Sequence, residues 1–75
     1  MIITPELLMK IRKVYRLTQA KLGELLGVTD EYINMIERGK CPVSKRLAGR
    51  ITYTFQLNAE KVAEIESVYK RYSID

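Results

Sequence analysis

The sequence predicts an all-α protein, a compact bundle of four to five helices in one domain spanning residues 1–75. Three observations favour this fold class. Apolar residues recur at three- and four-residue spacing, as on the buried face of a helix. Before each apolar run stands a threonine, serine or asparagine that can accept hydrogen bonds from unpaired helix amides. Very short joints separate the first three runs, and a glycine stands at the end of the second and of the third.

The first helix is predicted to begin at Thr4-Pro5-Glu6. The hydroxyl can cap the helix, proline suits its first position, and the acid suits its positive end. Its apolar residues at helical spacing are Leu7, Leu8, Ile11, Val14 and Tyr15.

A second, two-turn helix follows the cap Thr18, turns Leu22 and Leu26 to one face, and ends at Gly27, which can adopt positive φ. A third begins at the cap Thr29, turns Ile33 and Ile36 inward, and ends at Gly39. Cys41-Pro42 then prevents continuation of that helix.

Residues 50–57, RITYTFQL, fit two structures. Polar and apolar residues alternate there as in a strand, and β-branched and aromatic types are common. Leu47, Ile51 and Phe55 nevertheless lie four apart, and Ser44 can cap a helix that contains them. We favour the helix, although Gly49 costs it about 1 kcal/mol relative to alanine.

A last helix, about 58–72, follows Asn58 and carries one broad apolar face: Val62, Ile65, Val68, Tyr69 and Tyr72. This face either packs on the domain's own core or forms a dimer contact, which Met1, Ile2 and Ile3 can join. A chain of this size buries only about 60% of its unfolded surface, so a partner can complete the core.

Composition limits the function. The chain has no histidine and one cysteine, Cys41, so a zinc site, a Cys-His nucleophile pair and an internal disulfide are excluded or poorly supported. We expect no enzyme, no cofactor and no metal, and Cys41 fits a structural or incidental role better than a redox switch. The same count predicts a reducing, cytoplasmic location. The apolar start is far short of the roughly 20 residues of a membrane span and has no basic leader, so we expect a soluble protein.

The net charge of +4 and a pI near 9.4 favour polyanionic partners. The charges are unevenly distributed. Cations dominate residues 1–28 and are the only charges in residues 38–50, whereas an acidic island lies between these segments: Asp30, Glu31 and Glu37.

Two short helices joined at Gly27, with apolar residues filling the angle between them, form the pattern of a helix-turn-helix over about residues 18–38. The segment LTQAKLGELLGVTDEYINMIERGK resembles the helix-turn-helix of the phage Cro and repressor family, the Xre-type regulators. The likeness rests on Gln early in the second helix, the Leu-small-x-x-Leu-Gly-Val-Thr core, the Glu-x-Gly close, Arg12 upstream and Pro42-x-Ser44 downstream, and it covers about residues 6–57.

The resemblance implies a lambda-repressor-like bundle that reads operator DNA as a dimer, with its third helix in the major groove. The sequence departs from the family in two places. Gly23 replaces the usual alanine, a small-for-small change that keeps the helices close but loosens the second helix. Asp30 and Glu31 stand where relatives offer glutamine, arginine or serine, so the family's base contacts do not transfer directly.

By resemblance, Arg12 and Glu37 form a pair that bridges the first and third helices while the arginine leans toward a phosphate. The alternative is two unrelated surface charges. Thr18 and Gln19 lie at the start of the second helix, where backbone amides and the helix dipole favour a phosphate. They are otherwise an ordinary cap. The remaining expected backbone contacts, each otherwise a solvated charge or a cap, are Thr29, Arg38, Lys40, Lys45 and Arg46.

The expected base-facing residues of the third helix are Asp30, Glu31, Asn34, Met35 and Tyr32. Asn34 can pair with adenine, Met35 and Tyr32 can touch a thymine methyl or sugar, and a carboxylate can accept only from a cytosine amino group. Tyr32 can equally well lie at the rim of the core, and Met35 can equally well fill space between helices.

The adjacent acids admit three interpretations. They stabilise the helix start by about 0.3–1 kcal/mol each, or they lower affinity for wrong DNA sequences, or they lie on a surface that does not meet DNA. The overall prediction is a sequence-specific, double-stranded-DNA-binding transcriptional regulator, a small repressor acting as a homodimer on a palindromic operator. The alternative is a protein-interaction module of the same fold, an antitoxin or anti-repressor that uses the acidic helix on a protein partner.

Overall fold

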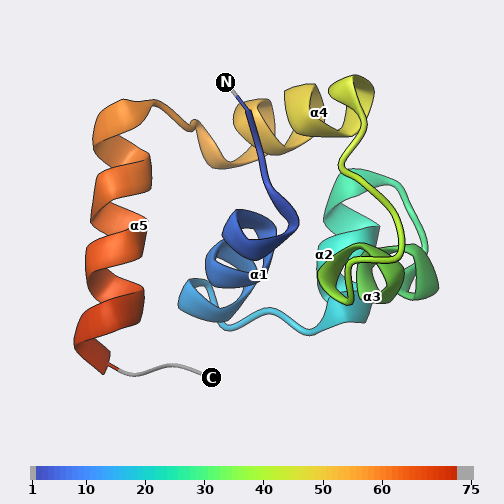
Figure 1. The fold of residues 1–75 in the computed structure, drawn as a ribbon, viewed down its shortest axis with the longest axis horizontal. Coiled ribbons are helices and arrows are strands. Elements are labelled where there is room, and N and C mark those ends of the chain that lie inside the picture. The colour runs from blue at the N-terminus through green and yellow to red at the C-terminus, as the bar shows by residue number, and fades with distance from the viewer. Residues whose placement is uncertain (1, 73–75) are drawn as a thin grey trace.

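The computed structural model describes residues 2–72 and contains five helices in this range, with no strand (Figure 1). The predicted all-α fold is confirmed. The helices are α1 (Pro5–Val14), α2 (Gln19–Leu26), α3 (Asp30–Glu37), α4 (Lys45–Phe55) and α5 (Ala59–Tyr72). No helix among the described residues is long and apolar enough to cross a membrane.

All five helices begin with the same device, a short polar side chain that accepts from a backbone amide three residues later. The distances are 3.0–3.1 Å for Thr4, Thr18, Thr29 and Ser44, and 2.7 Å for Asn58. These are the caps that the sequence predicts. Gly27 ends α2 with φ of 75°, as expected, whereas the turn after α1 places a non-glycine residue, Arg16, at φ 55°.

Residues 50–55 belong to α4, so the helical alternative for this segment is confirmed. The four-residue spacing of Leu47, Ile51 and Phe55 decides the structure, because all three are buried in the core. A strand would place Tyr53 on the same face as Ile51 and Phe55, which are buried, whereas Tyr53 is 79% exposed.

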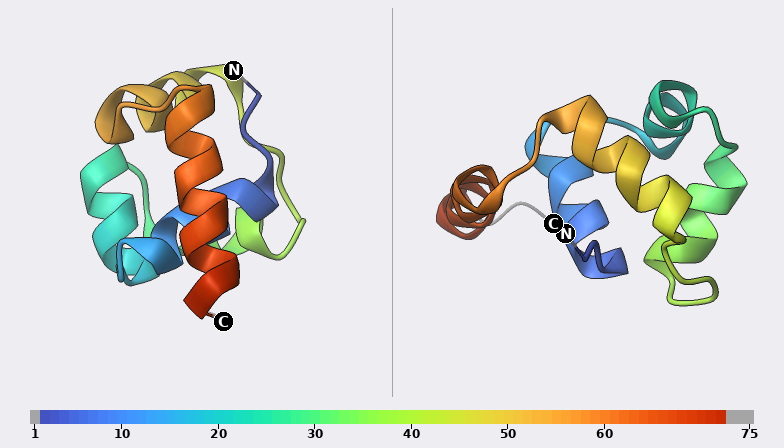
Figure 2. Two further views of the ribbon diagram at one scale, coloured as in Figure 1. Left: turned by 90° about the vertical axis from the view of Figure 1, so that its left-hand side faces the viewer. Right: turned by 90° about the horizontal axis from the view of Figure 1, so that it is seen from above.

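One core joins every helix. Its buried members are Ile3, Leu8, Ile11, Leu22, Leu26, Ile33, Ile36, Leu47, Ile51, Phe55, Leu57 and Ile65. Helix α1 lies centrally, with α5 packed on one side of it and α2 and α3 on the other (Figures 1 and 2). The molecule measures 29 × 23 × 20 Å, and α5 and the α2–α3 pair stand at opposite ends of its long axis.

Candidate nucleic-acid interface

The turn between α2 and α3 is built around a close backbone approach at Gly23. A Cβ atom added to this glycine would lie 2.6 Å from the Val28 carbonyl oxygen and 3.1 Å from the Thr29 carbonyl carbon. The Val28 amide also donates to the Gly23 carbonyl at 2.8 Å. Glycine at this position therefore lets α2 approach the start of α3 more closely than alanine would, which fixes the angle between the two helices.

A polar cluster ties α1, α2 and α3 together beside this turn. Arg12 donates through Nε to Glu37 Oε2 at 2.6 Å and through Nη2 to Glu37 Oε1 at 2.9 Å, a two-pronged ion pair. Its Nη1 also donates to the Leu17 carbonyl oxygen at 3.0 Å. Only 16% of the Arg12 side chain and 8% of the Glu37 side chain are exposed, so solvent screens this pair weakly.

Gln19 extends the cluster to the first turn of α2. Its Nε2 donates to Glu37 Oε1 at 3.2 Å, and its Oε1 accepts from Asn34 Nδ2 at 3.3 Å. Thr18 caps the same helix through the Lys21 amide. The start of α2, which carries unpaired amides and the positive end of a helix dipole, is thus held in a fixed position relative to α3.

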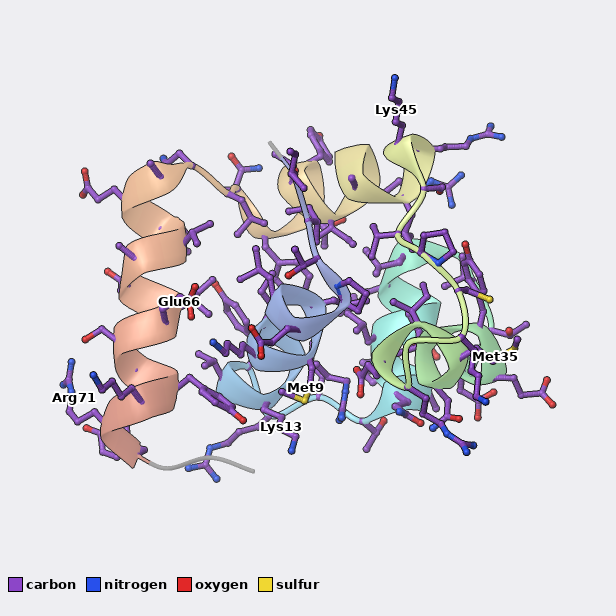
Figure 3. All side chains as sticks on the ribbon, in the orientation of Figure 1. Met9, Lys13, Met35, Lys45, Glu66 and Arg71 are labelled. Carbon is purple, nitrogen blue, oxygen red and sulfur yellow. The ribbon has the colours of Figure 1, made fainter. Side chains whose placement is uncertain are left out.

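The five expected base-facing residues of α3 differ in exposure. Asp30 and Glu31 are exposed, and Met35 is 44% exposed and projects from the outer side of α3 (Figure 3). Asn34 is half-buried beside Gln19, and Tyr32 is half-buried against the core. Ile33 and Ile36 are fully buried, so α3 presents its opposite side to solvent.

The two acids are not equivalent. Asp30 Oδ1 accepts from the Glu31 backbone amide at 2.9 Å, so this carboxylate is used in starting α3. Within residues 2–72, no hydrogen bond or ion pair involves the Glu31 carboxylate. Glu31 is the acid that is available to an external partner.

The cations after α3 lie on the surface. Arg38, Lys40, Lys45 and Arg46 are all exposed, and the described part of the chain provides none of them with an ion-pair partner. Lys45 points outward from the start of α4, away from Met35 (Figure 3). Thr29, also expected at the DNA backbone, uses its hydroxyl to cap α3.

Arg50 is a residue of this region that the sequence does not single out. Its Nη1 donates to the Leu26 carbonyl oxygen at 2.8 Å, so α4 satisfies an otherwise unpaired carbonyl at the end of α2. In the sequence, the one sign of this contact is that Arg50 lies one helical turn after Arg46. That sign is weak, because an arginine that is only solvated on the surface can have the same spacing. The contact ties α4 to the helix-turn-helix.

The expected dimer residues of α5 are largely used within the chain. Ile65 is 2% exposed and Ile3 is 5% exposed, so both side chains lie in the chain's own core, the alternative to a dimer contact. A part for them in dimerisation stays a prediction. Helix α5 folds back on α1, which places these side chains in the chain's own core. Val62, Val68 and Tyr69 are half-buried, Tyr72 is 65% exposed, and Met1 lies outside the described residues.

Helix α5 is also held by charge. Lys10 of α1 donates to Glu66 at 2.7 Å and lies 5.5 Å from the centre of the Tyr69 ring. The hydrogen bond to Glu66 raises the pKa of Lys10 above its ordinary 10.5, with burial acting in the opposite direction. Among the described residues, no group of His, Cys, Asp and Glu side chains is placed to hold a metal ion, and Cys41 is a free, half-buried residue packed against the core.

The fold and this surface define a helix-turn-helix protein. Comparison with known families gives the same class, because the helix-turn-helix family pattern matches residues 8–52, from α1 to within α4. The chain therefore belongs to the Cro- and repressor-type helix-turn-helix family of DNA-binding transcriptional regulators. No curated protein and no solved structure matches the chain significantly.

Proposed function

We propose that this protein is a sequence-specific repressor that binds a palindromic operator as a homodimer, with α3 in the major groove and the start of α2 on the DNA backbone. The observation that carries the proposal is the Arg12–Glu37–Gln19–Asn34 cluster, which fixes the phosphate-binding end of α2 against the exposed face of α3. A binding surface that is held rigid before binding loses little entropy on contact.

The proposed contacts fall into two groups. The first group contacts the DNA backbone. The phosphates of one DNA strand are held by Gln19, Thr18 and Arg12, and further backbone contacts come from Arg38, Lys40, Lys45, Arg46 and Thr29. Glu31, Asp30, Met35 and Tyr32 face the bases, where Glu31 accepts from a cytosine amino group and Met35 touches a thymine methyl. Occupancy of the operator would block polymerase, and this is the simplest action for a domain of this size.

Dimerisation is supported by the arrangement of the ends. The exposed Tyr72 and the 88% exposed Ile2 lie beyond the monomer's own core. An open groove between α1 and α5 includes Ile2, Leu7, Val62 and Tyr69 in its lining. Because α3 stands at the other end of the molecule, a symmetric pair of copies that meet near α5 carries one α3 helix on each outer side, as the two half-sites of a palindrome require.

A salt titration tests the proposed backbone contacts. We expect binding to duplex DNA to weaken with salt, and Lys40→Ala or Arg46→Ala to reduce the log–log slope by about 0.9 for each lost phosphate contact. Lys61→Ala on α5 is the matched control and should leave the slope unchanged. Equal slopes for the wild type and all variants would contradict the backbone contacts.

One observation favours a second function. The free carboxylate of Glu31 beside the exposed Asp30 gives α3 an acidic tip, which suits a basic protein surface. In this alternative the chain is an antitoxin or anti-repressor that keeps the fold but not the DNA contact. Indifference to duplex DNA together with recovery of a basic partner protein would favour it.

A further inference from the structure

The side-chain amide of Gln19 lies between two neighbours that determine its orientation. Glu37 Oε1 is 3.2 Å from one end of this amide, and Asn34 Nδ2 is 3.3 Å from the other. A carboxylate without its proton can only accept hydrogen bonds. Gln19 must therefore present its NH₂ group to Glu37, which leaves its oxygen for residue 34.

This orientation imposes a requirement on residue 34. The Gln19 oxygen can only accept, so the side chain opposite it must donate, and the amide of Asn34 does so. The amide cannot reverse, because Arg12 holds Glu37 through two hydrogen bonds and keeps it in place as an acceptor. Among the described residues, the Asn34 amide is the donor that this oxygen receives.

We propose that Asn34 is a positioning residue, which holds the Gln19 side chain in its phosphate-contacting orientation, and not a reader of bases. This inference rests on the proposed DNA-binding function. Gln19 uses one N–H on Glu37 and keeps the second N–H and its backbone amide for a phosphate at the start of α2. Without Asn34 the Gln19 oxygen loses its partner and the side chain gains rotamer freedom.

Burial supports the separation of roles on α3. Asn34 is half-buried in the cluster, whereas Met35 is 44% exposed and Glu31 is exposed with no partner among the described residues. Neighbouring positions of one short helix thus have different roles in DNA binding. Glu31 and Met35 meet the bases, and Asn34 acts through α2.

The first experiment uses the free protein, so its result does not depend on DNA binding. In ¹⁵N NMR spectra, Asn34→Ala should move the two side-chain NH₂ signals of Gln19 toward the values of a mobile amide. Met35→Ala, the matched control on the same helix, should leave them in place. Unmoved Gln19 signals in Asn34→Ala would overturn the proposal. Alanine is a strong helix former, so α3 should stay folded, and a thermal melt verifies this.

The second experiment is a double-mutant cycle in DNA affinity. We expect Asn34→Ala to weaken binding by about three- to ten-fold, the effect of one net hydrogen bond, equally on the preferred site and on random duplex. Its base preferences should match the wild type, and the effect should largely vanish in a Gln19→Ala background. A changed preference at one base pair, or additive effects of the two substitutions, would overturn the proposal.

These results separate the two claims. If the wild type does not bind duplex DNA, the proposed function fails, and the inferred role in phosphate contact fails with it. If the wild type binds and Asn34→Ala alters one base preference, DNA binding stands and Asn34 is a base reader.

Discussion

At the scale of single residues, the acids at the start of α3 have separate roles. Asp30 accepts from the Glu31 amide and so stabilises the first turn of the helix. Glu31 has no such contact among the described residues and is exposed on the proposed DNA face. A free carboxylate near phosphates repels DNA in general and penalises every base that lacks an amino donor. On the proposed DNA-binding function, this role would account for an acid on the DNA face of a protein of net charge +4.

We therefore expect Glu31→Gln to raise affinity for random duplex DNA by about two- to five-fold, because one charge near a screened polyanion contributes about 0.5–1 kcal/mol. Glu64→Gln makes the same change of charge on α5, at the other end of the molecule, and should have little effect. Fluorescence anisotropy with a random duplex measures both variants. Unchanged or lower affinity for Glu31→Gln would contradict this role.

The Arg12–Glu37 pair makes a second prediction at this scale. Arg12→Met should destabilise the fold by about 2 kcal/mol or more, because it leaves a nearly buried carboxylate without its cation. Arg12→Met with Glu37→Met should recover most of that loss, since no charge is then stranded. Urea unfolding of the two variants and the wild type gives the comparison. A double variant less stable than Arg12→Met would show that the pair itself, not the stranded charge, matters.

At the scale of the elements, alanine substitutions at two glycines within helices distinguish the effect of packing on stability from the effect of helix propensity. Gly49 in α4 has nothing within 4 Å of the position that an added Cβ would take, whereas the same position on Gly23 in α2 lies 2.6 Å from the Val28 carbonyl oxygen. Gly49→Ala should stabilise the protein by about 0.5–1 kcal/mol through propensity alone.

Gly23→Ala gains the same propensity but must push α2 away from the turn before α3. We expect this variant to be less stable than Gly49→Ala and to bind DNA more weakly, because the angle between α2 and α3 opens. Thermal melts and DNA titrations of the matched pair test both statements. A Gly23→Ala protein as stable as Gly49→Ala, with unaltered DNA affinity, would refute the tight approach.

Helix α5 makes a further prediction at this scale. Ile65→Ala should cost about 2–5 kcal/mol, the usual effect of truncating a buried isoleucine. Tyr72→Ala, at an exposed position of the same helix, should leave monomer stability nearly unchanged and weaken self-association. Sedimentation equilibrium and thermal melts distinguish the two effects. A stable, unaltered Ile65→Ala protein would contradict its place in the core.

The elements also show what the sequence can and cannot predict. The caps Thr4, Thr18, Thr29, Ser44 and Asn58 mark all five helix starts, because capping depends on neighbours only three residues away. Contacts between helices are harder to predict from the sequence. The bond from Arg50 to the Leu26 carbonyl and the burial of Ile65 depend on how α4 and α5 fold back, which spacing alone does not determine.

The site follows the same division. Exposure of Asp30, Glu31 and Met35 follows from the spacing of Ile33 and Ile36, so the outward face of α3 could be predicted. The hydrogen bond from Asn34 to Gln19 joins residues of different helices, so it could not be predicted from the spacing within one helix. A polar residue on an outward face looks like a base reader until its partner on the neighbouring helix is known.

At the scale of the whole molecule, the α2–α3 pair and α5 occupy opposite ends of one compact bundle. The core runs through all five helices, so a contact near α5 is rigidly connected to the position of α3. A symmetric pair joined near α5 would present two α3 helices to one side of a duplex. Specific recognition of an inverted repeat is the central claim of this account.

Selection from a random duplex pool tests that claim most directly. At about 0.1 M salt, where a few phosphate contacts still support binding, the retained duplexes would be sequenced. We expect an inverted repeat with half-sites about 10 base pairs apart, and a cytosine in each half-site opposite Glu31. Recovery of no sequence above background would contradict the account and would favour a protein partner for the acidic tip of α3.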